Sequence, residues 1–123
     1  MRQELLALKE KRRPYRLKTI RYWYHVHGSD SDEGEPIIRW EYESPRALPE
    51  ARHCLNHVHL DHDIPCGTAT LDLRRCHLAT GWVTIESVLR FVIYELDVAP
   101  ASPGWHEELA ASECRFRREF TVD

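Results

Sequence analysis

Two stretches in which side chains alternate with a period of two constrain the fold of this sequence more than any other feature. In residues 15–28, one face of an extended strand would carry Ile20, Tyr22, Tyr24 and Val26. The opposite face would carry Arg21, Trp23, His25 and His27. Residues 37–43 repeat the pattern, with Ile38, Trp40 and Tyr42 against Arg39, Glu41 and Glu43. Successive side chains of a strand point to opposite faces. The turn-rich loop at 28–36 therefore predicts a β-hairpin with one apolar and one polar face.

The remaining segments predict further strands and three helices. Residues 2–12 predict a helix, because Leu5, Leu6 and Leu8 share part of one face and charged residues fill the rest. Residues 52–60 alternate and predict a third strand, residues 61–70 a loop, and residues 71–78 a fourth strand. Residues 83–98 carry apolar residues at helical spacing after Thr84, and a final helix opens at Ser102.

This order of elements predicts one α+β domain spanning residues 1–123. We expect an antiparallel sheet of three to four strands with helices packed on one face, and the other face open and polar. No apolar run reaches the roughly 20 residues of a membrane helix. The charged N-terminal segment does not resemble a signal peptide. We therefore expect a cytoplasmic protein with no membrane contact, whose four cysteines do not form a disulfide scaffold.

The formal net charge of −3 combines two opposite segments. Residues 1–21 hold eight Lys and Arg against two acids, whereas residues 30–50 hold seven acids against two arginines. This balance argues against a uniformly basic nucleic-acid-binding protein. It leaves open either a local basic arm or a solvated helix end.

Five of the eight histidines fall between His53 and His77. The segment that includes His57, His59, Asp61 and His62 spells H-x-H-x-D-H, and it resembles the zinc signature of metallo-β-lactamase-type hydrolases. That fold needs roughly 200 residues or more and further downstream ligands, so we do not expect it here. A simpler zinc site stays open as an alternative. It would draw on those four residues or on the zinc-compatible set Cys54, His57, His59, Cys66, Cys76 and His77.

The polar faces of the predicted strands offer a second chemistry that needs no metal. If these faces coincide, they bring His57 and His59 beside Arg39 and Glu41. The histidines would then act as acid and base on a phosphodiester, and Arg39 would stabilise phosphate charge. The same face could hold single-stranded RNA through a further set of residues: Arg21, Trp23, His25 and His27. The alternative is a solvated polar face whose histidines pair with neighbouring side chains.

Four short pieces within residues 15–98 resemble the TumE-type toxins of bacterial toxin–antitoxin modules. They are Arg21-Tyr22-Trp23-Tyr24, Ile37-Ile38-Arg39-Trp40-Glu41-Tyr42, His57-Val58-His59-Leu60, and His77-Leu78 with Thr80-Gly81 before the predicted helix. The resemblance covers about two thirds of the chain. It implies a compact toxin-like protein that a cognate antitoxin protein binds and neutralises.

We therefore predict a small toxin-like protein that acts on RNA or translation. If it is an enzyme, we expect it to cleave RNA without a metal ion or other cofactor. Two alternatives remain open. One is a non-enzymatic protein-binding module, with homo-oligomers possible. The other is a small zinc-binding protein that uses the His- and Cys-rich segment 53–77.

Overall fold

The computed structural model describes residues 1–8, 16–29, 34–45, 50 and 55–121. The chain divides into two compact units, which are described separately. The first comprises Met1–Glu4 and Ile20–Gly81, and the second comprises Leu5–Thr19 and Trp82–Asp123.

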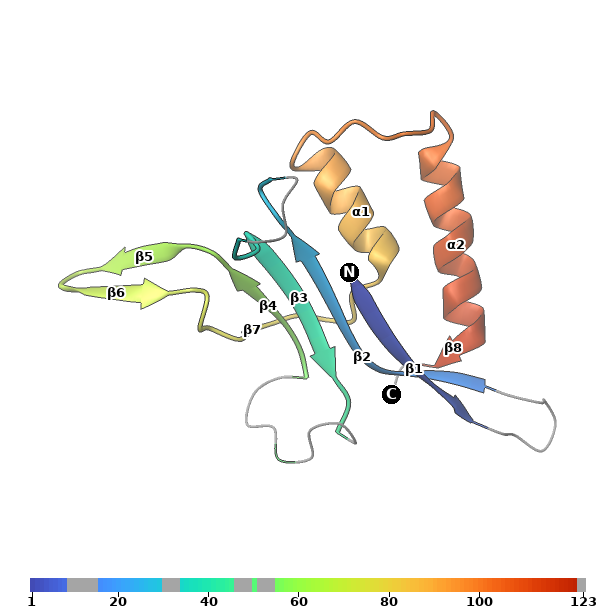
Figure 1. Ribbon diagram of the computed structural model, residues 1–123, viewed down its shortest axis with the longest axis horizontal. Coiled ribbons are helices and arrows are strands. Elements are labelled where there is room, and N and C mark those ends of the chain that lie inside the picture. The colour runs from blue at the N-terminus through green and yellow to red at the C-terminus, as the bar shows by residue number, and fades with distance from the viewer. Residues whose placement is uncertain (9–15, 30–33, 46–49, 51–54, 122–123) are drawn as a thin grey trace. The chain divides into compact units, whose positions relative to one another are not determined.

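A main sheet, a small second sheet and two helices confirm the α+β class (Figure 1). The main sheet has six described strands, two more than the predicted maximum of four: five in the order β1-β2-β3-β4-β7, and β8, which pairs with β2. The five strands are β1 (Arg2–Leu8), β2 (Arg16–Val26), β3 (Ile38–Glu43), β4 (Asn56–Leu60) and β7 (Leu78–Ala79). The pairs β2–β3, β3–β4 and β4–β7 are antiparallel, whereas β8 (Phe120–Thr121) pairs parallel with the start of β2.

The predicted hairpin of residues 15–28 and 37–43 is present as β2 and β3. Tyr22 lies opposite Tyr42, and His25 lies opposite Arg39. Residues directly opposite each other in an antiparallel pair share a face of the sheet. The tyrosines and the charged residues therefore lie on opposite faces, as the alternation indicates.

Three tyrosines form the buried layer of the first unit. Tyr22, Tyr24 and Tyr42 are at most 3% exposed. The rings of Tyr22 and Tyr24 stack with centroids 4.5 Å apart. The Tyr22 hydroxyl donates to Asn56 Oδ1 at 3.2 Å, so its polar end is satisfied and links β2 to β4.

The N-terminal helix prediction is wrong for the described residues 2–8, which form β1. Leu6 and Leu8 are half-buried, whereas Leu5 and Ala7 between them are exposed. This is the period of a strand rather than of a helix. Pairing with β2 supplies backbone hydrogen bonds that local helix propensity does not outweigh.

The predicted loop at 61–70 is also wrong, because β5 (Asp63–Cys66) and β6 (Ala69–Asp72) form a hairpin that projects past the end of β4 (Figure 1). Its turn places Gly67 at a φ of 64°, which glycine adopts without a steric penalty.

Neighbouring strand boundaries also differ from the predictions. The predicted strand at 71–78 is interrupted, since residues 73–77 form a turn and a connection between β6 and β7. The third predicted strand begins later, at Asn56, and residues 52–54 lie outside the described part of the chain.

The second unit contains α1 (Ile85–Tyr94) and α2 (Trp105–Glu119). Thr84 caps α1 by accepting a hydrogen bond from the Ser87 backbone N–H at 3.2 Å, as the sequence indicates. The helix is shorter than the predicted 83–98. A salt bridge of 2.7 Å between Arg90 and Glu113 joins the two helices. Within the described residues, neither helix is long and apolar enough to cross a bilayer.

We expect Tyr22→Ala to lower the free energy of unfolding by about 3–5 kcal/mol, because it removes a fully buried ring and leaves a cavity. Urea unfolding followed by far-UV circular dichroism measures this change. Tyr94 is 62% exposed and serves as the matched control. Tyr94→Ala should cost no more than about 1.5 kcal/mol, the value of one aromatic contact. Equal losses for the two variants would contradict the assigned core.

Candidate functional site

The register of three strands brings the predicted catalytic residues together on one face of the sheet, which we call the polar face. Glu41 on β3 lies opposite His57 on β4, and Arg39 lies opposite His59. On the other side of β3, His25 lies opposite Arg39. These five residues therefore come from three neighbouring strands and share one face.

Glu41 lies at the centre of this group. Its Oε2 is 3.6 Å from His57 Nε2 and 4.0 Å from His59 Nε2. Its Oε1 is 3.5 Å from His25 Nε2 and 3.8 Å from Arg39 Nη1. One carboxylate therefore contacts three imidazoles and one guanidinium, and each of its oxygens faces a different pair of partners.

A third histidine, His77, joins His57 and His59 from the connection before β7. The imidazole centroid of His77 lies 4.8 Å from that of His57 and 4.7 Å from that of His59. Each of the three residues offers a ring nitrogen, and these nitrogens all lie within 4.8 Å of one another. We call these residues the histidine cluster. In a tetrahedral zinc site the ligand nitrogens are about 3.4 Å apart, so small side-chain rotations suffice to meet around one ion.

Pairing of β7 with β4 explains how His77 reaches this position. His57 lies opposite Ala79, and an antiparallel register continued by two residues places His77 beside His59. His77 belonged to the zinc-compatible set noted in the sequence. No local pattern in the sequence distinguishes it from the other members, because its partner strand lies about 20 residues away.

The polar face is less open than expected at β4. His57 is 3% exposed and His59 is 6% exposed, whereas His77 is exposed to solvent. Burial, together with the positive charge of Arg39, lowers the pKa of His59. Burial also lowers the pKa of His25, although Glu41 opposes this effect. Both imidazoles therefore favour the neutral form, which is the form that binds metal ions.

The structure does not bring Asp61 and His62 into the histidine cluster. Both residues follow the end of β4 and are exposed, and Asp61 instead pairs with Arg74 at 3.5 Å. Of the predicted zinc alternative His57, His59, Asp61 and His62, the structure brings only the first two members together.

Two cysteines of the wider zinc-compatible set, Cys66 and Cys76, also lie outside the histidine cluster. Cys66 Sγ lies on the exposed hairpin, 3.6 Å from the Ile64 carbonyl. Cys76 Sγ donates to the Asp72 carbonyl at 3.3 Å. Cys54 falls outside the described residues. Among the described residues, the candidate ligands here are therefore imidazoles rather than thiolates.

The residues predicted to bind nucleic acid lie on the part of the polar face that β2 forms, or directly after that strand. The guanidinium of Arg21 lies 5.4 Å from the Trp23 ring centre, and that of Arg2 lies 5.6 Å from it. Arg21 also pairs with Glu4 at 3.2 Å and with Glu43 at 3.6 Å. Carboxylates therefore offset the positive charge that a phosphate backbone would require.

His27 follows the end of β2, beyond the other predicted nucleic-acid-binding residues. Its ring centroid lies 6.3 Å from that of His25. Its Nδ1 is buried without a hydrogen-bond partner in the part of the chain that the structure describes.

Two kinds of chemistry fit this geometry. The histidine cluster offers three imidazole nitrogen ligands, with the Glu41 carboxylate beside His57 and His59. Without a metal, the same histidines and carboxylate could exchange protons with a bound substrate. Comparisons of the chain with protein-family models, with curated proteins and with solved structures give no match. The resemblance to TumE-type toxins therefore stays a prediction.

We expect the metal-free protein, held in a chelator, to lose stability as the pH falls from 7.5 to 5.5. A histidine whose pKa is lower in the folded state takes up protons more readily when unfolded, so stability declines below the ordinary histidine pKa of about 6.5. Urea unfolding midpoints at the two pH values measure this loss. His25→Gln should reduce the pH dependence, because it removes one of the two imidazoles with a lowered pKa. Identical pH dependence in wild type and His25→Gln would contradict this assignment.

Proposed function

We propose that the protein binds one divalent transition-metal ion, with zinc as the best match, through His57, His59 and His77. The observation that carries this proposal is the convergence of three imidazole nitrogens within 4.8 Å of one another. Three histidines form a ligand set that zinc adopts in catalytic sites, where the fourth position is left to water or substrate. This proposal takes up the zinc-binding alternative and replaces two of its predicted ligands.

The surroundings of the ligands support the proposal. Two of the three come from β4, whose ladders to β3 and β7 restrain them. His59 Nδ1 is buried and has no hydrogen-bond partner among the described residues. A buried polar atom without a partner is costly, and many such atoms in native proteins face an ion or water.

Glu41 determines what a bound ion could do. Its Oε2 already lies within 4.0 Å of both buried imidazoles, so it would lie close to an ion held between them. A zinc ion lowers the pKa of a bound water molecule to about 7. Beside such an ion, Glu41 would serve as the proton acceptor, and His25 and Arg39 would orient its carboxylate from the other oxygen. The proposed function is therefore a zinc site suited to hydrolysis.

We expect the wild-type protein to bind one equivalent of zinc, and His59→Ala to weaken zinc binding by more than about 100-fold. Loss of a ligand should cost at least as much as loss of a residue that only supports one. Competition with a chromophoric chelator measures the affinity, and cobalt substitution reports the ligand geometry. His62→Ala is the matched control, because His62 is an exposed neighbour outside the cluster. Wild-type protein that retains less than about a tenth of an equivalent of zinc would contradict the proposal.

Metal-independent cleavage of RNA is a second candidate function. The observation that favours it is the position of Glu41 between His25 and the pair His57 and His59, with Arg39 adjacent. A carboxylate beside imidazoles can tune both a general acid and a general base. In a cell, such an activity would suit a toxin that an antitoxin protein neutralises.

If this second candidate is correct, purified protein should cleave RNA in the presence of a chelator, and His57→Ala should lower the rate by about 100-fold or more. Induction in bacteria should also arrest growth, and a cognate antitoxin should co-purify. Cleavage that occurs only with added zinc would favour the metal site instead. If neither cleavage nor growth arrest occurs, the RNA proposal is wrong.

A further inference from the structure

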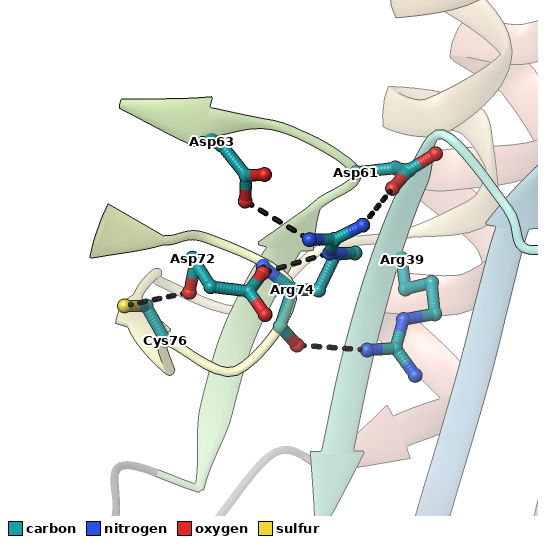
Figure 2. Close-up of polar contacts among 6 residues, drawn as sticks. All are labelled: Arg39, Asp61, Asp63, Asp72, Arg74 and Cys76. Carbon is teal, nitrogen blue, oxygen red and sulfur yellow. Dashed lines mark hydrogen bonds and ion pairs between the residues drawn. The ribbon is translucent and has the colours of Figure 1, made fainter. Parts of the chain in front are cut away.

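Three carboxylates surround the guanidinium of Arg74 in the turn between β6 and His77 (Figure 2). Nη2 lies 2.9 Å from Asp63 Oδ1, Nε lies 2.8 Å from Asp72 Oδ1, and Nη1 lies 3.5 Å from Asp61 Oδ1. These aspartates belong to different parts of the first unit, namely β5, β6 and the residue after β4. One side chain therefore ties the turn to both strands of the hairpin and to the end of β4.

The backbone of the same turn is held as well. The Arg74 N–H donates to Asp72 Oδ1 at 3.0 Å, and the Arg74 carbonyl accepts a hydrogen bond from Arg39 Nη2 at 3.1 Å (Figure 2). The Leu73 N–H donates to the His62 carbonyl at 2.9 Å, and the Leu73 side chain is buried. The backbone of the turn is thus held by Arg39 on the polar face and by Asp72 on the hairpin.

Arg74, which forms these ion pairs, lies three residues before His77. Of the three proposed ligands, His77 is the one least restrained by strand pairing. His57 and His59 are held by the ladders of β4, whereas His77 precedes β7, which has only two residues. A ligand on a short connection must be ordered before it can bind, and groups that order it in advance strengthen binding.

We propose that Arg74 is a positioning residue of the metal site, and that the ion pairs of the β5–β6 hairpin hold His77 in reach of His57 and His59. This inference rests on the proposed zinc site. It assigns a role to Arg39 as well: through the Arg74 carbonyl, Arg39 restrains the turn in addition to its contact with Glu41. The inference also gives a role to Asp61 and Asp63, which lie outside the histidine cluster and pair with Arg74.

The alternative is that this network only stabilises the hairpin. Arg74 is 45% exposed, and exposed ion pairs contribute little to global stability. The two roles differ in what they change. A merely stabilising network alters the unfolding midpoint and leaves the zinc affinity of the folded protein unchanged, whereas a positioning network alters the affinity and the ligand geometry.

The test compares zinc affinities of folded wild type, Arg74→Ala, Arg74→Lys and Arg75→Ala by chelator competition. Arg75 lies in the same exposed turn and carries the same charge, which makes it the matched control. We expect Arg74→Ala to bind zinc about tenfold more weakly, the usual effect of losing a group that orients a ligand. Arg74→Lys should recover part of the loss, and Arg75→Ala should bind within about twofold of wild type. With cobalt, Arg74→Ala should show an altered visible spectrum.

If Arg74→Ala does not fold, Asp63→Asn removes one ion pair at an exposed site and should weaken zinc binding in the same direction. Wild-type affinity and an unchanged cobalt spectrum in folded Arg74→Ala would overturn the inference while leaving the zinc site intact. Equal weakening by Arg75→Ala would also overturn it, because the effect would then be one of net charge. Failure of the wild type to bind zinc would reject the proposed function, and the positioning role with it.

Discussion

The antiparallel register of β2, β3 and β4 is the constraint on which the candidate site depends. It places Glu41 opposite Trp23 on one side and His57 on the other, and Arg39 between His25 and His59. A shift of one residue in either pairing would turn an entire set of side chains to the other face. The buried tyrosines oppose such a shift, because Tyr22 and Tyr42 would then leave the apolar face. Packing on the apolar face thus determines the strand register, and this register brings the residues of the polar face together.

Burial of His57 and His59 on the polar face costs desolvation free energy. Polar groups withdrawn from water need partners, and the pair receives the Glu41 carboxylate and the His77 ring. The partners are incomplete, since His59 Nδ1 has no hydrogen bond among the described residues. Clusters of titratable side chains in partly buried positions are typical of functional sites. A metal ion would complete the set of partners without any change in the strands.

The sequence predicted much of the site and less of what surrounds it. Alternation placed His25, Arg39 with Glu41, and His59 each on one face of its own predicted strand, and the pairing of β2, β3 and β4 brings these faces together. The same alternation could not identify His77 as the third imidazole, because a two-residue strand has no detectable period. The hairpin of β5 and β6 was missed because Asp63, Pro65 and Gly67 are typical of loops, and ion pairs to Arg74 are visible only once the chain has folded.

By itself, the sequence determined which residues share a face within each strand, since side-chain alternation is a property of the local backbone. It also determined the start of α1, because the Thr84 cap acts within one turn. Only the tertiary structure decided that β7 pairs with β4, that residues 2–8 extend as a strand, and that His77 meets His57 and His59. Those outcomes depend on contacts between residues far apart in the chain. Their free energy comes from pairing and burial across the sheet, which no short segment contains.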